Sequence, residues 1–169
     1  MKLNVGCGLD YREGFLNIDG NAGLKKVDVI MAIGKDSFVR RFGSDSVSVI
    51  VAQDVVEHLF RWEAVRLVAE FFGILRKGGK LEIRVPNAEA IMASAVLTVP
   101  MKIVLLFGGQ DVPQGTGMDD LRKDRPELFC HKFGWTPLSL MKVLDSAGFS
   151  DVKVLRRPRD TNMTFTAIK

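Results

Sequence analysis

Cysteine is scarce in this chain of 169 residues, which contains only two. Cys7 and Cys130 lie far apart in the sequence, whereas a disulfide framework or a structural zinc site needs about four clustered ligands. We therefore predict that both residues are reduced thiols and that the chain holds no metal.

Long apolar segments are also missing. The longest apolar run, residues 90–107, is interrupted by Pro100 and Lys102 and falls short of the ~20 apolar residues that span a bilayer. We predict no transmembrane segment, although residues 91–107 could mediate contact between copies of the chain. The first expected strand begins directly after Met1, which leaves no room for a targeting segment and predicts a cytoplasmic protein.

A dense basic stripe, the usual mark of a nucleic-acid-binding protein, is absent as well. The net charge is only +4, and the positive residues are scattered apart from Arg156, Arg157 and Arg159. For these three arginines we favour a solvated surface over an anionic partner, and we expect no nucleic acid. Hydrophobic residues make up 47% of the chain and charged residues 26%, which is typical of a globular protein and fits one domain, 1–169.

Apolar periodicity predicts short strands that alternate with helices. The expected strands are 2–5, 15–19, 27–32, 47–52, 80–85, 152–155 and 163–168. The expected helices lie within 35–45, 54–77, 89–107 (split near Pro100) and 136–148. This order predicts an α/β fold with a doubly wound, mostly parallel seven-stranded sheet, helices on both faces and a C-terminal antiparallel strand pair. Residues 108–134 are expected to form a loop, and 89–134 as a whole a helical and loop insertion on the substrate side.

Local patterns set the expected ends of the long helix. Asp54 and Glu57 form a capping-box pattern, which predicts that the helix begins there, and Gly78-Gly79 predicts its end. Trp62, Phe71 and Phe72 follow at helical spacing, so all three are expected in the core.

The most informative stretch is Leu3-Asn4-Val5-Gly6-Cys7-Gly8, a buried strand that opens into a glycine turn. A second strand ends at Asp19-Gly20, so the fold would bring backbone N–H groups and a carboxylate together where α/β sheets bind nucleotides. A dinucleotide fold needs a third glycine where this chain has Tyr11, and no phosphate-binding lysine follows the glycines. These absences favour a nucleoside without a pyrophosphate and disfavour a nicotinamide-dependent oxidoreductase.

Five segments together carry a resemblance to a known family. They are Leu3-Asn4-Val5-Gly6-Cys7-Gly8, Asn17-Ile18-Asp19, Asp54-Val55-Val56-Glu57-His58-Leu59, Leu75-Arg76-Lys77-Gly78-Gly79-Lys80-Leu81 and Ala147-Gly148-Phe149. In this order, they resemble the motifs of the class I S-adenosylmethionine-dependent methyltransferases. The resemblance covers nearly the whole chain and implies a Rossmann-like fold, S-adenosylmethionine as cofactor and methyl transfer as the reaction.

The resemblance also assigns residues to the cofactor. The expected cofactor-binding residues are Asn4, Gly6, Cys7, Gly8, Asp19, Gly20, Ala32, Ile33, Gln53 and Asp54. It implies that the glycine turn faces the amino-acid part and that Asp19 binds the ribose. The end of the third strand would lie beside adenine, and the pair after the fourth strand near the amino-acid part or the sulfonium. Two positions depart from the family's pattern, since Asn4 stands where many members have an acidic residue and Ala32 where many have an acidic or amide residue.

The acceptor is less well defined than the cofactor. Many relatives that methylate exocyclic base amines have an Asn/Asp-Pro-Pro-aromatic motif where this chain has Gln53-Asp54-Val55-Val56. We therefore expect methyl transfer to an oxygen or nitrogen of a small molecule or sugar. His131, and after it His58, are the candidate bases, although each could instead be structural. The alternative is a non-catalytic binding module that keeps the fold but partners another protein.

Overall fold

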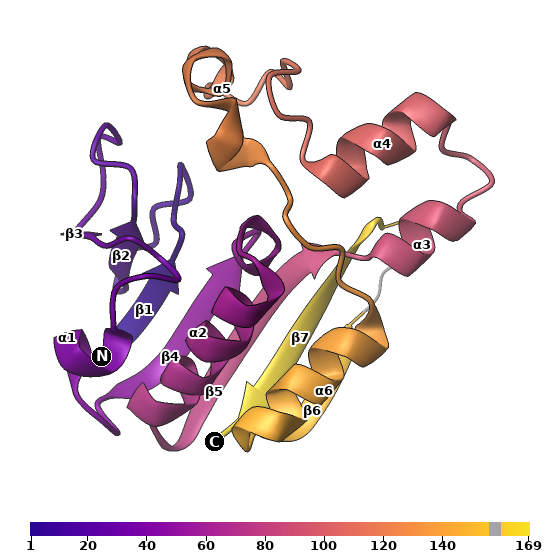
Figure 1. The fold of residues 1–169 in the computed structure, drawn as a ribbon. Coiled ribbons are helices and arrows are strands. Elements are labelled where there is room, and N and C mark those ends of the chain that lie inside the picture. Colours follow the sequence, from indigo (N-terminus) through magenta and orange to yellow (C-terminus); the bar gives the residue numbers. More distant parts are fainter. Residues whose placement is uncertain (156–159) are drawn as a thin grey trace.

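Seven strands form one sheet through the centre of the molecule, in the order β3-β2-β1-β4-β5-β7-β6 (Figure 1). The computed structural model describes residues 1–155 and 160–169, so Arg156, Arg157 and Arg159 lie outside the described residues. The strands are β1 (Lys2–Val5), β2 (Leu16–Asp19), β3 (Val29–Ile30), β4 (Val47–Gln53), β5 (Leu75–Pro86), β6 (Ser150–Leu155) and β7 (Asn162–Ile168). Strands β1 to β5 pair in parallel, and β7 runs antiparallel to both β5 and β6. This arrangement confirms the predicted mostly parallel sheet and its C-terminal antiparallel pair.

The helices fall into two groups in Figure 1. The described helices are α1 (Phe38–Phe42), the short 3-10 helix η1 (Val56–His58), α2 (Arg61–Ile74), α3 (Ala88–Ala93), α4 (Val99–Phe107), α5 (Asp119–Asp124), the 3-10 helix η2 (Pro126–Phe129) and α6 (Pro137–Ala147). Helices α2 and α6 lie in front of the sheet, whereas α3, α4 and α5 lie beyond the ends of its strands (Figure 1).

The helices that pack on the sheet share one face, where helices on both faces were expected. Helix α2 contacts both α1 and α6. The connections from β1 to β2 and from β2 to β3, which would hold the helices of the other face, contain no helix within the described residues. Both are shorter than the dozen or more residues that a crossover helix needs. The second face is therefore partly exposed, at residues such as Glu82, Thr164 and Thr166.

The buried centre of the sheet aligns the ends of its strands. Val5 pairs with Ala52, and Ala52 pairs with Ile83, and all three side chains are fully buried. Because these strands are parallel and in register, the residues that follow them emerge at one edge of the sheet. The glycine turn after β1 and Asp54 after β4 are thereby brought together.

The expected capping box at Asp54 and Glu57 is wrong. Asp54 has a positive φ of 54°, and its carboxylate pairs with Arg84 of β5. The Glu57 carboxylate is buried and caps nothing, and α2 begins only at Arg61. A tertiary ion pair thus replaces the local hydrogen bonds that the pattern predicts.

Helix α2 buries two of its three aromatic residues that were expected in the core, one fully and one partly. Trp62, expected inside, is 62% exposed and lies beside Arg66, whose guanidinium carbon is 5.7 Å from the ring centroid. Phe71 is fully buried as expected, and Phe72 is partly buried against Phe149.

The expected end of α2 at Gly78-Gly79 is wrong as well. The helix ends at Ile74, and β5 starts with Leu75. Val47 pairs with Leu75 but Val49 pairs with Lys80, so the two glycines lie in a bulge of the strand.

The segment expected as a loop over 108–134 contains α5 and η2. Acidic Asp119 and Asp120 lie in the first turn of α5 and basic Arg122 and Lys123 in its last turn, which suits the helix dipole. The preceding residues form two helices as expected, with Pro100 in the first turn of the second. None of the helices in residues 1–155 and 160–169 has the length and apolar character needed to cross a bilayer.

Candidate functional site

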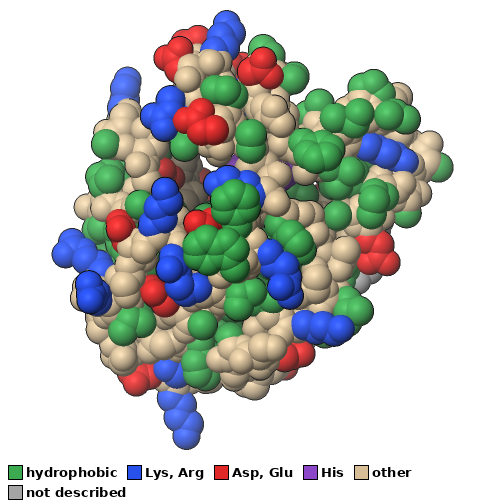
Figure 2. Space-filling model, viewed as in Figure 1, with side chains coloured by type: hydrophobic (Ala, Val, Ile, Leu, Met, Phe, Trp, Pro, Cys, Tyr) green, Lys and Arg blue, Asp and Glu red, His purple; other side chains and the backbone are tan. Residues whose placement is uncertain are grey.

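A cavity of about 910 Å³ opens at the edge of the sheet where β1, β2 and β4 end. Its wall includes all ten residues that the sequence assigns to the cofactor, namely Asn4, Gly6, Cys7, Gly8, Asp19, Gly20, Ala32, Ile33, Gln53 and Asp54. Figure 2 shows the surface hollowed between the segment that carries α5 and the body of the molecule. The strand ends therefore gather residues from distant parts of the chain around one space.

The glycine turn lines this cavity. Its backbone takes a conformation that favours glycine. Gly6 and Gly8 have φ values of 67° and 50°. The N–H groups of Gly6 and Cys7 both donate to the carbonyl of Ile18, at 2.8 and 3.0 Å. A Cβ on Gly6 would lie 2.4 Å from Val55 Cγ2, so the turn also packs too closely for a side chain.

Asp19 joins two loops at the cavity wall. Its Oδ2 accepts a hydrogen bond from the N–H of Gly8 at 2.9 Å, and its Oδ1 accepts one from the N–H of Asn21 at 2.9 Å. A carboxylate has about four acceptor positions, so these two bonds leave capacity for the hydroxyls of a ligand.

Asn4 supports the turn from beneath. Its amide nitrogen donates to the carbonyl of Asp10 at 2.7 Å and to Oδ1 of Asn17 at 2.9 Å. Asn17 in turn accepts from the N–H of Arg12 and donates to Asp28. Because the side-chain nitrogen of Asn4 already donates to Asp10 and Asn17, only Oδ1 of Asn4 is available to a ligand, as a hydrogen-bond acceptor.

The residues after β4 are held by β5. Asp54 pairs with Arg84, whose Nε lies 3.2 Å from Asp54 Oδ1, and this pairing raises the pKa of the guanidinium. The amide nitrogen of Gln53 donates to Glu82 Oε1 at 2.9 Å. Both predicted residues therefore reach the cavity wall in fixed positions.

The expected adenine end is bounded by the segment after β3. Ala32 and Ile33 line the cavity, and the N–H of Ala32 already donates to Asp36 Oδ2 at 2.7 Å. The backbone of Ala32 can therefore offer a ligand its carbonyl but not this N–H.

Cys7 lies in the glycine turn as a buried thiol that is 3% exposed. Burial, and after it the negative charge of Asp19, raises the pKa of this thiol to about 11. Cys7 therefore stays protonated at neutral pH and acts as a small packing residue.

Sequence reasoning expected residues 89–134 on the substrate side but named none of the residues that form the far wall of the cavity. Its residues include Arg84, Met118, Leu121, Arg125, Leu128, Phe129 and Lys132. All but Arg84 come from residues 118–132, and Met118 reaches the glycine turn, where its Cε lies 3.4 Å from the position of a Cβ on Gly8. No local pattern marks them, because only the packing of α5 and η2 over the strand ends brings them to the cavity.

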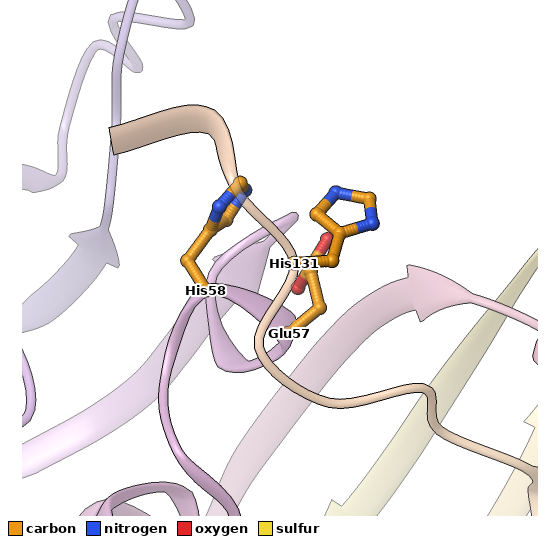
Figure 3. Close-up of side chains that lie close together, drawn as sticks. All are labelled: Glu57, His58 and His131. Carbon is orange, nitrogen blue, oxygen red and sulfur yellow. The ribbon is translucent and has the colours of Figure 1, made fainter. Parts of the chain in front are cut away.

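The two histidines lie against each other, with ring centroids 4.9 Å apart and ring planes at 77° (Figure 3). His58 lines the cavity, whereas His131 is not among the described residues of its wall. His58 Nδ1 is 3.1 Å from the carbonyl of Cys130. Burial, and after it the charge of His131, lowers the pKa of His58 to about 4, and burial also lowers the pKa of His131.

Glu57 completes this cluster and was not expected in it. Its side chain is 1% exposed, and neither carboxylate oxygen has a hydrogen-bond partner in the described part of the chain. Burial, and after it the charge of Asp54, raises the pKa of Glu57 well above its ordinary value. The backbone carbonyl of Glu57 accepts from the N–H of Lys132 at 2.7 Å, which fixes the segment of His131 against η1.

Comparisons with known proteins give structural matches only. No protein-family model matches the chain, and no curated protein matches it in sequence. A SAM-dependent methyltransferase from Archaeoglobus fulgidus matches with a TM-score of 0.63 at 16% identity, over 99% of this chain and 85% of that one. An S-adenosylmethionine-dependent methyltransferase from Mesorhizobium loti matches with a TM-score of 0.63 at 15% identity, over 99% of this chain and 90% of that one.

A third match is human N-acetylserotonin methyltransferase, crystallised in complex with SAM, with a TM-score of 0.57 at 12% identity. The match covers 99% of this chain but only 47% of the human one. At such identities a match shows the fold and leaves substrate and activity open. The chain therefore has the fold of the class I S-adenosylmethionine-dependent methyltransferases, as its motifs predict.

Proposed function

We propose that this protein is an S-adenosylmethionine-dependent methyltransferase that acts on an oxygen or nitrogen atom of a small molecule or sugar. The observation that carries the proposal is the meeting of the glycine turn and the Asp19 carboxylate on one cavity of about 910 Å³. This volume lies within the range of about 300–1,000 Å³ that is usual for small-molecule sites. The methyltransferase fold of the chain supports the same conclusion.

The cofactor would lie across the strand ends in this proposal. Gly6, Cys7 and Gly8 would face its amino-acid part, and Asp19 would accept hydrogen bonds from its ribose hydroxyls. Ala32 and Ile33 would bound the adenine. Asn4, Gly20, Gln53 and Asp54 would complete the wall, with the last two near the amino-acid part or the sulfonium.

The remaining wall would shape the acceptor site. Within the domain 1–169, the insertion 89–134 contributes Met118, Leu121 and Phe129 to the cavity, so it would exclude water from the reacting groups. A bound sulfonium supplies an already activated methyl group, and the chain's task is then to align donor and acceptor. Such alignment contributes about 7–11 kcal/mol to lowering a barrier.

His131 and His58 would act on the acceptor where it keeps its proton at neutral pH. A positioned base adds about 100- to 10,000-fold in rate. His58 reaches the cavity, but its pKa of about 4 makes it a weak proton acceptor. The position of His131 after the insertion makes it the first candidate, and its ring lies against that of His58.

The test combines calorimetry with S-adenosylhomocysteine and a turnover assay. We expect the protein to bind S-adenosylhomocysteine but not NAD, and to release S-adenosylhomocysteine, detected by mass spectrometry, when S-adenosylmethionine and a panel of phenols, amines and sugars are added. Tight binding of NAD together with no response to S-adenosylhomocysteine would refute the proposal.

An exposed apolar surface favours one alternative, a binding module that partners another protein. Met92, Val96, Val99, Ile103 and Phe107 of the α3–α4 region are each more than half exposed. Figure 2 shows hydrophobic side chains gathered over this region. Light scattering would detect a homo-oligomer formed through 91–107, and cofactor binding without turnover on any acceptor would favour the binding module over the enzyme.

A further inference from the structure

We propose that Glu57, His58 and His131 bind a divalent transition-metal ion, with Zn²⁺ as the first candidate. Each side chain offers one ligand atom, and these atoms all lie within 4.8 Å of one another. Figure 3 shows the three side chains converging between η1 and the segment that carries His131. The inference stands on this cluster alone and does not depend on methyl transfer.

Glu57 gives the strongest reason for a bound cation. Buried carboxylates in folded proteins are paired, hydrogen-bonded or bound to a metal. Both oxygens of Glu57 are buried, and neither has a partner among residues 1–155 and 160–169. A cation between the oxygens and the two imidazoles would supply the missing interaction.

His58 is oriented as a metal ligand. A carbonyl oxygen only accepts hydrogen bonds, so the proton of the neutral ring resides on Nδ1, which faces the carbonyl of Cys130 at 3.1 Å. The lone pair is then on Nε2. A hydrogen bond from the other ring nitrogen to a backbone carbonyl is the usual support of a metal-binding histidine.

Backbone hydrogen bonds hold the segment of His131 in place. The backbone N–H of His131 donates to the carbonyl of Phe107 at 3.2 Å, and the backbone N–H of Lys132 donates to the backbone carbonyl of Glu57. Zinc–nitrogen bonds are about 2.0–2.1 Å long, so two ligands of one ion lie at most about 4 Å apart. Closing the cluster on an ion therefore needs only small side-chain movements.

The ligand set indicates the kind of metal. Two imidazoles and one carboxylate suit Zn²⁺ and other divalent transition metals better than Mg²⁺ or Ca²⁺, which prefer oxygen ligands. Three protein ligands leave a position open, as in catalytic zinc sites. Because His58 lines the cavity, an acceptor hydroxyl bound at that position would have a lower pKa and would release its proton to water, so that neither histidine would be needed as base.

Other charges lie near the cluster. Asp54 is close enough to affect both Glu57 and His131, and its negative charge favours a cation. Arg122 and Lys132 are near His58, and their positive charges oppose one. We expect these charged groups to influence how tightly the metal ion binds, and not which side chains coordinate it.

The test uses untagged, metal-depleted protein titrated with Zn²⁺ by calorimetry and with Co²⁺ by visible absorption. We expect one ion per chain, a visible spectrum typical of nitrogen and oxygen ligands, and a rise in the thermal midpoint on adding Zn²⁺. Glu57→Gln and His131→Ala should each weaken Zn²⁺ binding at least tenfold. Cys130→Ala is the matched control, because it removes the nearby thiol but keeps the carbonyl that holds His58.

The competing explanation is a buried, protonated Glu57 with only a packing role. It predicts that Zn²⁺ neither binds stoichiometrically nor raises the thermal midpoint, and that Glu57→Gln and wild type respond alike. Either result would overturn the proposal. The affinity of the metal-free protein for S-adenosylhomocysteine, measured separately, should be the same in Glu57→Gln and wild type, so the two functions can fail independently.

Discussion

Asp19 links the loops on two sides of the cavity through the N–H groups of Gly8 and Asn21. We expect Asp19→Ala to weaken S-adenosylhomocysteine binding at least tenfold, about 1.4 kcal/mol, because the variant loses its acceptor for the ribose hydroxyls. Calorimetry would measure the change.

The control for this variant is Glu13→Ala, which removes an exposed carboxylate of the same segment. It removes one negative charge, as Asp19→Ala does, but lies outside the cavity wall, so it should leave the affinity unchanged. An Asp19→Ala protein that keeps both its fold and its full affinity would contradict our placement of the ribose.

Gly6 combines a left-handed backbone with a close neighbour, and the two effects can be separated. Gly6→Ala should lower the free energy of unfolding by ~2 kcal/mol or more, since the new Cβ would meet Val55. Gly14→Ala, at a φ of 78° with nothing within 4 Å, should cost about 1 kcal/mol from the backbone alone. Denaturant unfolding would measure both, and equal losses would show that the contact with Val55 does not matter.

At the scale of single elements, α6 shows where local signals are reliable. Thr136 caps the helix, with its Oγ1 accepting from the N–H of Ser139 at 3.2 Å, and Gly148 ends it with a φ of 101°. Both ends agree with the helix expected within 136–148. The capping hydrogen bonds join residues that are close in sequence, so tertiary contacts do not need to create them.

The cap of α6 can be tested directly. Thr136→Ala removes the side-chain acceptor of the first turn and should lower the free energy of unfolding by about 1 kcal/mol. Thr136→Ser keeps the hydroxyl and should behave like wild type in the same denaturant experiment. A loss of similar size in both variants would point to the methyl group and not to the cap.

Helix α2 shows the opposite case. The sequence at Asp54 offers a cap of the same quality, but Arg84 takes its carboxylate and the chain turns away through η1. Strand pairing brings Arg84 to this point from a distance of thirty residues. The capping pattern contains no information about that partner.

At the scale of the whole molecule, the cavity is built from two parts of the chain. The strand ends supply the glycine turn and Asp19, and residues 118–132 supply the facing wall. A ligand that contacts both parts should hold them together. We expect S-adenosylhomocysteine to slow trypsin cleavage after the exposed Lys123 of α5, as followed by mass spectrometry.

Cleavage after Lys142, which lies on α6 away from the cavity wall, serves as the reference site in the same digest. The ratio of the cleavage rate after Lys123 to the cleavage rate after Lys142 corrects for general stabilisation by the ligand. Binding by calorimetry without any protection of Lys123 would show that α5 does not contact the cofactor.

The sequence by itself determined the order of elements and the sheet with its antiparallel pair, because strand periodicity and the glycine turn act over a few neighbouring residues. The ten residues that its family resemblance assigns to a cofactor all line one cavity. The tertiary structure decided what needs contacts between distant segments. It brought Met118 over Gly8, paired Asp54 with Arg84 and, within the described residues, left one sheet face without helices. It also set buried Glu57 beside His58 and His131, since only the packing of a remote segment against η1 can join these side chains.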